Sequence, residues 1–165
     1  GQATRIYRRY GHYASDRVTP STNPTLFFLA LGAALFFALS HLIAAWKRRG
    51  EPAPAELWAR RVSWVALAGA LAVVVTIGFF VFMLIDLQNA GRDIVLSLPT
   101  RPMLWFLSSV LALGGFTLLA LLGLYPALFR GRMTIWRKTH FVLLAAAMST
   151  LMWAFFVWNA VGFRV

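Results

Sequence analysis

The stretch VSWVALAGALAVVVTIGFFVFMLI, residues 62–85, holds no charged side chain along its whole length. An α-helix rises about 1.5 Å per residue, so about 20 such residues cross the roughly 30 Å hydrocarbon core of a bilayer. Working outward, three further stretches of this kind are found at residues 25–46, 103–129 and 141–163. The sequence therefore predicts an all-α polytopic membrane protein whose four transmembrane helices pack as a bundle.

The composition supports a membrane protein. The chain has 165 residues, of which 60% are hydrophobic and 13% are charged, whereas soluble domains average about 45–50% apolar and about 25% charged residues. So few charges cannot coat a soluble globule, but they can cap membrane-spanning helices. Residues 1–24 are polar and predict an extracytoplasmic lead-in, followed by a four-helix membrane domain over residues 25–165. The chain has no cysteine, which excludes disulfides and thiolate sites.

The positive charge of the chain predicts its orientation. Sixteen Lys and Arg residues stand against five acidic residues, an excess that in a soluble chain would indicate nucleic-acid binding. Here most basic residues flank apolar stretches. Two loops expected at 47–61 and 130–138 share one side of the membrane, whereas the loop on the other side holds only Arg92 and Arg101. The positive-inside rule places the first pair of loops in the cytoplasm and both termini outside. Their basic residues, which we expect to set topology and contact lipid headgroups, are Lys47, Arg48, Arg49, Arg60, Arg61, Arg130, Arg132, Arg137 and Lys138.

Small residues recur every four positions and predict the packing faces. Lipid supplies no hydrophobic force between helices, so helices pack where small side chains let their backbones approach. The candidates are Ala30, Ala34, Ala38, Ala66, Ala70, Gly114, Gly115, Gly123, Ala146, Thr150 and Ala154, with Ala34, Ala38, Gly114 and Gly115 as the principal interface residues. The faces expected to meet lipid or another protein carry Phe27, Phe28, Phe36, Phe37, Phe79, Phe80 and Phe82.

Residue types that support catalysis or transport are missing from the middle of the predicted helices. Carboxylates inside a membrane mark proton or ion pathways, but Glu51, Glu56, Asp86 and Asp93 lie at helix ends or in loops. No nucleophile motif, metalloprotease motif or phosphate-binding glycine loop occurs. We therefore expect no catalytic residue, no metal site, no cofactor and no small-molecule substrate.

Two histidines are the main candidates for a binding site. His41 precedes Lys47 and His140 follows Lys138, which places both near the cytoplasmic surface at similar depth. Two imidazoles on neighbouring helices can ligate a haem iron axially. The alternative is that each ring reaches the interface or bonds a neighbouring carbonyl.

The C-terminal residues 132–165, RMTIWRKTHFVLLAAAMSTLMWAFFVWNAVGFRV, resemble a known family. They are similar to the C-terminal membrane region of beta-lactamase-related (CubicO-type) bacterial serine hydrolases, in a pattern made here by Arg137, His140, Trp158, Asn159 and Gly162. Arg17-Val18 and the LPTRP sequence at 98–102 fit the same region. The catalytic domain of that family has no counterpart in this chain. The resemblance therefore implies a non-catalytic membrane module.

These observations favour an integral module of the bacterial cytoplasmic (inner) membrane. We expect it to act as an anchor or scaffold, or as an accessory subunit of a larger membrane complex of respiratory or photosynthetic type. Its partners would be the lipid bilayer and other membrane subunits. Trp158 would anchor at the interface while the Asn159 amide bonds a facing helix or interfacial water. The alternatives are a haem-binding electron carrier using His41 and His140, and the membrane tail of a serine hydrolase.

Overall fold

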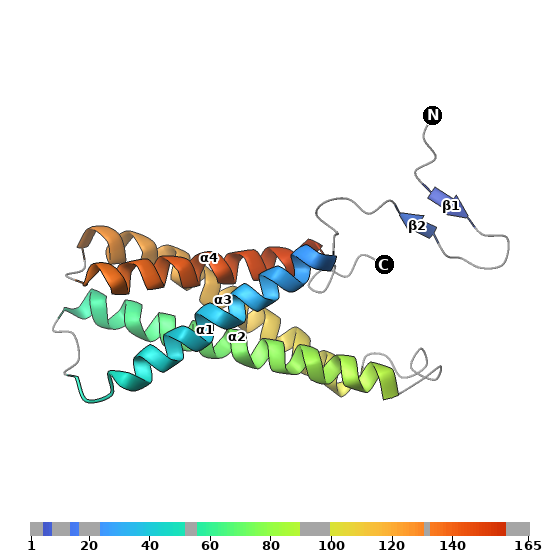
Figure 1. Cartoon of the computed structure of the whole chain (residues 1–165), viewed down its shortest axis with the longest axis horizontal. Coiled ribbons are helices and arrows are strands. Elements are labelled where there is room, and N and C mark those ends of the chain that lie inside the picture. Colours follow the sequence, from blue (N-terminus) through green and yellow to red (C-terminus); the bar gives the residue numbers. More distant parts are fainter. Residues whose placement is uncertain are drawn as a thin grey trace.

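Four long helices make up most of the computed structural model, which describes residues 5–7, 14–16, 24–51, 56–89, 100–130 and 133–157. They are α1 (Pro24–Lys47), α2 (Leu57–Asn89), α3 (Arg101–Tyr125) and α4 (Ile135–Val157). A π-helical turn, η3 (Pro126–Arg130), continues directly from α3. The helices run lengthwise beside one another in an elongated bundle (Figure 1).

Each of the four helices is long and apolar enough to cross a membrane. The spans cover 24, 33, 30 and 23 residues when η3 is counted with α3, and about 20 residues suffice for the hydrocarbon core. The predicted fold, an all-α membrane protein of four helices, is confirmed. The 33-residue α2 exceeds that requirement, so it must tilt or extend beyond the hydrocarbon.

The helix boundaries differ from the predicted ones at the basic loops. Helix α2 begins at Leu57 rather than at residue 62, and α4 begins at Ile135 rather than at residue 141. Consequently Arg60, Arg61, Arg137 and Lys138, expected in loops, lie in the first turns of these helices. A charged residue does not end a helix, because a long basic side chain can extend from the last turns to the water. Helix α3 ends at Tyr125 because Pro126 cannot donate the next backbone hydrogen bond.

A short β-hairpin precedes the bundle. Strands β1 (Arg5–Tyr7) and β2 (Ala14–Asp16) pair antiparallel, with Ile6 opposite Ser15. The sequence of residues 1–24 predicted only a polar lead-in. Three residues are too few to display the alternation of polar and apolar side chains by which a strand is predicted.

Small residues bring the helices together, but not all those predicted to do so. Ala34, Ala38 and Ala70 are fully buried. The close approaches between α2, α3 and α4 occur at Gly69, where a Cβ would lie 2.9 Å from Met148 Cε, and at Gly114, where it would lie 3.2 Å from Met152 Cε. Gly69 was not among the predicted packing residues.

Three of the predicted small residues face outward instead. Gly115, Ala146 and Thr150 are exposed, and a Cβ at Gly115 would meet nothing within 4 Å. Helix α4 buries a neighbouring face that includes Leu144, Met148, Leu151 and Phe155. The spacing of four identified a row of small residues correctly, but a spacing alone does not say which row of a helix meets its neighbours.

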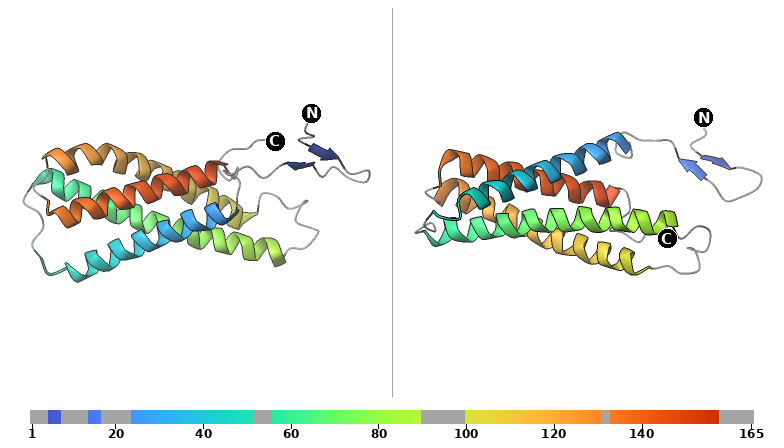
Figure 2. Two further views of the ribbon diagram at one scale, coloured as in Figure 1. Left: turned by 45° about the horizontal axis from the view of Figure 1, so that its top comes forward. Right: turned by 60° about the horizontal axis from the view of Figure 1, so that its bottom comes forward.

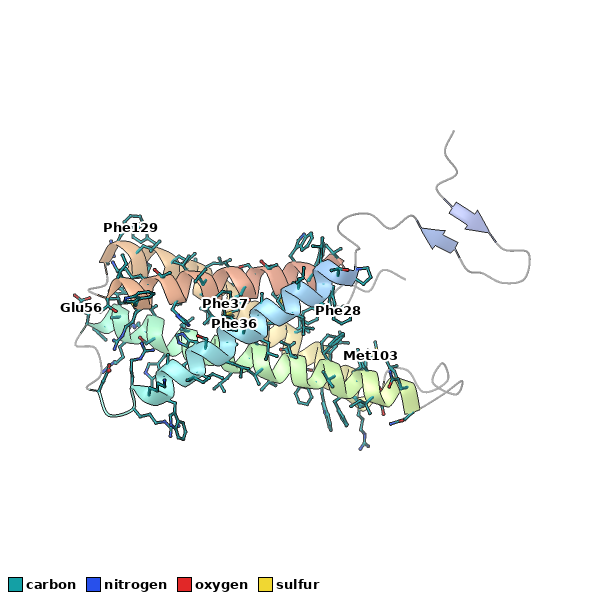
Figure 3. All side chains as sticks on the ribbon, in the orientation of Figure 1. Phe28, Phe36, Phe37, Glu56, Met103 and Phe129 are labelled. Carbon is teal, nitrogen blue, oxygen red and sulfur yellow. The ribbon has the colours of Figure 1, made fainter. Side chains whose placement is uncertain are left out.

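Four phenylalanines fill one end of the bundle. Phe27 of α1, Phe80 of α2, Phe106 of α3 and Phe155 of α4 pack with ring centroids 5.4–6.1 Å apart. We call this region the aromatic end. Phe27 and Phe80 were expected on faces that meet lipid or another protein, but they pack instead against rings of the other helices. Phe28 and Phe36 are exposed on α1 (Figure 3), as is Phe82 on α2.

Candidate functional site

The positive charge of the described residues gathers at the other end of the bundle, which we call the basic end. The C-termini of α1 and η3 and the N-termini of α2 and α4 lie together there (Figure 1). The basic residues at this end are Lys47, Arg48, Arg49, Arg60, Arg61, Arg130, Arg137 and Lys138. Arg132, predicted to belong to the same set, lies outside the described residues.

Several of these cations rest on aromatic rings. The guanidinium carbon of Arg49 lies 3.8 Å from the centroid of the Trp46 ring. Arg61 lies 5.3 Å from the centroid of Trp58, and Arg130 lies 5.6 Å from that of Tyr125. Trp and Tyr at a membrane interface combine an apolar body with a polar edge, and the face of their rings attracts a cation. The three pairs therefore hold positive charge at the rim of the bundle.

A cavity of about 800 Å³ opens between α1, α2 and α4 at the basic end. Helices α1 and α4 diverge toward this end (Figure 1 and the left view of Figure 2). Apolar and small side chains line part of the cavity, including Ala44, Ala45, Leu67 and Phe141. Its polar lining comprises His41, Arg48, Glu51, Arg60, Ser63, Thr134, Arg137 and His140.

The structure brings the two predicted histidines together in this cavity. The ring centroids of His41 on α1 and His140 on α4 are 5.9 Å apart, with the ring planes at 43°. The Nε2 atom of His140 shares a hydrogen bond of 3.0 Å with the Ser40 hydroxyl. The Nδ1 atom of His41 is buried and, among the described residues, has no hydrogen-bond partner. One imidazole is thus bonded to a neighbouring helix, whereas the other has a buried nitrogen that no described residue bonds.

An ion pair connects the rim of the cavity. An Nη atom of Arg137 donates to a carboxylate oxygen of Glu51 over 2.8 Å. Next to it on α4, Lys138 Nζ donates to the Leu128 carbonyl over 2.9 Å. Both contacts join the start of α4 to neighbouring segments of the basic end, and the first neutralises one of the arginines around the cavity.

Away from this cavity, the buried threonine hydroxyls of the bundle are satisfied by main-chain carbonyls. Thr76 and Thr117 are the buried polar residues of the described part of the chain. Thr76 donates to the Ser109 carbonyl on α3 over 3.2 Å, and Thr117 donates to the Leu113 carbonyl of its own helix over 2.8 Å. Serine and threonine hydroxyls in helices commonly bond in this way, and bonded so they are not positioned to react with a substrate.

Of the predicted interface residues, the structure places Ala34, Ala38 and Gly114 between helices, while Trp158 and Asn159 lie outside the described residues. The cavity was not predicted from the sequence. The signal was present on α1, where His41, Ala44, Ala45 and Arg48 follow the spacing i, i+3, i+4, i+7 that places residues on one helix face. All four line the cavity.

No protein-family model, no curated protein and no solved structure matches this chain.

Proposed function

We propose that this protein is a non-catalytic membrane module that anchors or scaffolds other proteins at the membrane. Four helices able to cross a membrane make it an integral membrane protein. The observation that carries the proposal is the separation of apolar and charged side chains within the bundle. Away from the cavity at the basic end, apolar residues and bonded hydroxyls lie between the helices, and the charged side chains of the described helices lie near the helix ends. Such a bundle holds a polypeptide firmly in a bilayer, because charges in its interior would be costly.

The outer surface also supports this function. Large apolar side chains are exposed on every helix, among them Phe36, Leu111, Leu122, Phe129 and Phe156. Figure 3 shows Phe129 projecting away from the bundle. In water such a surface would aggregate, whereas in a bilayer it contacts lipid tails or neighbouring membrane subunits.

The experiment that tests anchoring uses a soluble fluorescent protein fused ahead of the chain. We expect the fusion to sediment with bacterial membranes and to stay there after extraction with alkaline carbonate, which removes peripheral proteins. The fluorescent protein alone serves as the control and remains soluble. Release of the fusion by carbonate would contradict the proposal.

A scaffold or accessory subunit must also have a protein partner. We propose that any such partner contacts the exposed aromatic surface within the bacterial inner membrane, with the basic end facing the cytoplasm. Mild solubilisation of native membranes, followed by purification and quantitative mass spectrometry, tests this. A partner at fixed stoichiometry is expected for an accessory subunit, and purification of the chain alone would restrict its function to anchoring.

Haem binding by His41 and His140 is a second candidate function, favoured by the 5.9 Å separation of their rings. We rank it second because His140 Nε2 already bonds Ser40, and because the unpartnered nitrogen of His41 is Nδ1, the ring nitrogen nearer the helix backbone. An absorption spectrum of the purified protein tests it. A Soret band that disappears in His41→Ala would establish haem binding, and a spectrum without the band would exclude this function.

The resemblance to CubicO-type hydrolases suggests which kind of protein the bundle would anchor. Two residues of the resembling pattern, Arg137 and His140, hold structural contacts at the basic end. We propose that the bundle acts as the membrane region of a larger hydrolase. The genomic sequence preceding Gly1 tests this: a continuous reading frame encoding a Ser-x-x-Lys domain is expected, and a start codon immediately before Gly1 would contradict it.

A further inference from the structure

We propose that the cavity at the basic end binds the phosphate headgroup of an anionic phospholipid, with the attached acyl chain lying along the apolar wall. The inference rests on the proposed membrane-anchor function, since it takes its ligand from the surrounding bilayer. It makes the basic end a lipid-specific site rather than a surface of scattered charges.

The charge of the cavity selects an anion. Three arginines, Arg48, Arg60 and Arg137, line it together with one glutamate, Glu51. Because Glu51 pairs with Arg137, the excess positive charge comes from Arg48 and Arg60. Guanidinium groups suit phosphate because their planar donors match two phosphate oxygens at once. Basic pockets between transmembrane helices near the membrane surface are typical binding sites for phospholipid headgroups.

The neighbouring arginines make the assignment specific. Arg49 and Arg61 adjoin Arg48 and Arg60 in sequence, but they lie over the rings of Trp46 and Trp58 and do not line the cavity. Each helix end thus directs one arginine into the cavity and the next onto an indole. If these arginines served only as general surface charge, no such difference between neighbours would be needed.

The size and lining of the cavity suit an amphiphile rather than a bare ion. Its volume of about 800 Å³ lies within the range of roughly 300–1,000 Å³ found for ligand pockets and far exceeds what a phosphate ion needs. Ala44, Ala45, Leu67 and Phe141 provide an apolar wall below the arginines. Trp64 and Trp136 also line the cavity, as expected where a headgroup meets acyl chains.

The histidine pair provides the remaining recognition. His41 Nδ1 is buried with no partner among the described residues, and leaving a buried polar atom unbonded is unfavourable. Because His41 also lines the cavity, a small rotation of its ring would let this nitrogen bond a phosphate oxygen or a headgroup hydroxyl of the bound lipid. His140, bonded to Ser40, lies beside it with the ring centroids 5.9 Å apart.

The test compares two double variants that remove the same charge. Arg48→Gln with Arg60→Gln alters the cavity, whereas Arg49→Gln with Arg61→Gln alters only the indole-stacked neighbours. Each full-length protein is purified in detergent and titrated with phosphatidylglycerol or phosphatidylcholine, and bound lipid is counted by native mass spectrometry. We expect the unaltered protein to prefer phosphatidylglycerol, the cavity variant to lose at least tenfold in affinity for it, and the control to change less than twofold.

Two further variants test the other walls of the site. His41→Phe removes the imidazole donor while keeping an aromatic ring, and Ala45→Trp fills the cavity without changing charge. We expect weaker phosphatidylglycerol binding in both. Circular dichroism and gel filtration verify the fold of every variant. A loss of lipid binding can then be distinguished from a loss of structure.

The outcomes separate this inference from the function on which it rests. Equal losses in the two arginine variants, or none in either, would overturn it. Competition by millimolar inorganic phosphate alone would assign the site to free anions instead of lipid, and a Soret band in the purified protein would assign it to haem. If these proteins resist carbonate extraction yet bind both lipids equally, the inference fails while the anchor function stands. If the unaltered protein is extracted, the anchor function fails as well.

Discussion

The two ends of this bundle are built in opposite ways. At the aromatic end four phenylalanine rings, one from each helix, fill the space between the helices. At the basic end α1 and α4 diverge, and histidines and arginines surround a cavity. Helices in a membrane are held together mainly by close packing, so the aromatic end joins them. The basic end holds a cavity instead, which leaves room for a ligand.

The largest effect is expected from removing a ring at the aromatic end. Phe155 is fully buried and contacts Phe27, Phe80 and Phe106. Phe155→Ala should lower the free energy of unfolding by about 3 kcal/mol, the low end of the range for such truncations, because lipid is as apolar as the core. Unfolding in mixed micelles with increasing sodium dodecyl sulfate measures this.

The matched control for that variant is its neighbour on α4. Phe156 is 63% exposed, so Phe156→Ala should leave the unfolding free energy nearly unchanged. Similar losses in the two variants would show that the rings of the aromatic end do not hold the bundle together.

Enlarging an alanine should distinguish the ends directly. Ala154 is buried beside the aromatic cluster, so Ala154→Phe should cost about 1–3 kcal/mol by overpacking. Ala45 lines the cavity, and Ala45→Phe should cost less than about 0.5 kcal/mol because the ring has space to enter. Thermal unfolding followed by circular dichroism compares them. Equal destabilisation would mean that the cavity is not open to an added side chain.

A smaller effect is expected from the hydrogen bond between α1 and α4. Ser40→Ala removes the hydroxyl that bonds His140 and should cost about 0.6 kcal/mol, the average for interhelical bonds in membranes. Ser149→Ala, whose hydroxyl bonds the Ala145 carbonyl of its own helix, is the control and should cost less. The same detergent titration measures both, and the reverse order would contradict the assigned contacts.

The smallest effect concerns the ion pair at the rim of the cavity. Glu51 is 55% exposed in its pair with Arg137, and exposed pairs contribute about 0–1 kcal/mol. Glu51→Gln should therefore lower stability by less than about 1 kcal/mol, and the difference should vanish in 1 M salt, where exposed charges are screened. A loss that persists in high salt would indicate a stronger contact than a surface ion pair.

The helices were predictable because hydrophobic length is a property of consecutive residues. Residues 62–85 sufficed to predict a spanning helix, and α2 contains all of them. The extra turns of α2 and α4 were not predicted, since Arg60 and Arg137 lie outside the apolar stretches, although basic side chains can continue a helix into water. The orientation of individual faces was also missed, because Phe27 and Phe28 are neighbours of the same type, yet one is buried and the other is 63% exposed.

The candidate site was predictable only in its histidines. His41 and His140 were chosen for their depth along separate helices, and the structure brings their rings within 5.9 Å. That Arg48 rather than Arg49 lines the cavity follows the helical spacing from His41. That this face of α1 borders a cavity depends on how α1 packs against α2 and α4, which composition and charge do not show.

The central claim is that the chain crosses the membrane four times, with the basic end on one side. Because the chain has no cysteine, single substitutions at exposed positions can be labelled one at a time: Gly50→Cys and Thr134→Cys at the basic end, and Asn89→Cys at the other. A maleimide that cannot cross membranes is applied to sealed bacterial spheroplasts and again after lysis. We predict that Asn89→Cys labels in sealed spheroplasts, whereas Gly50→Cys and Thr134→Cys label only after lysis. Labelling of all three from the same side would contradict four crossings and the account built on them.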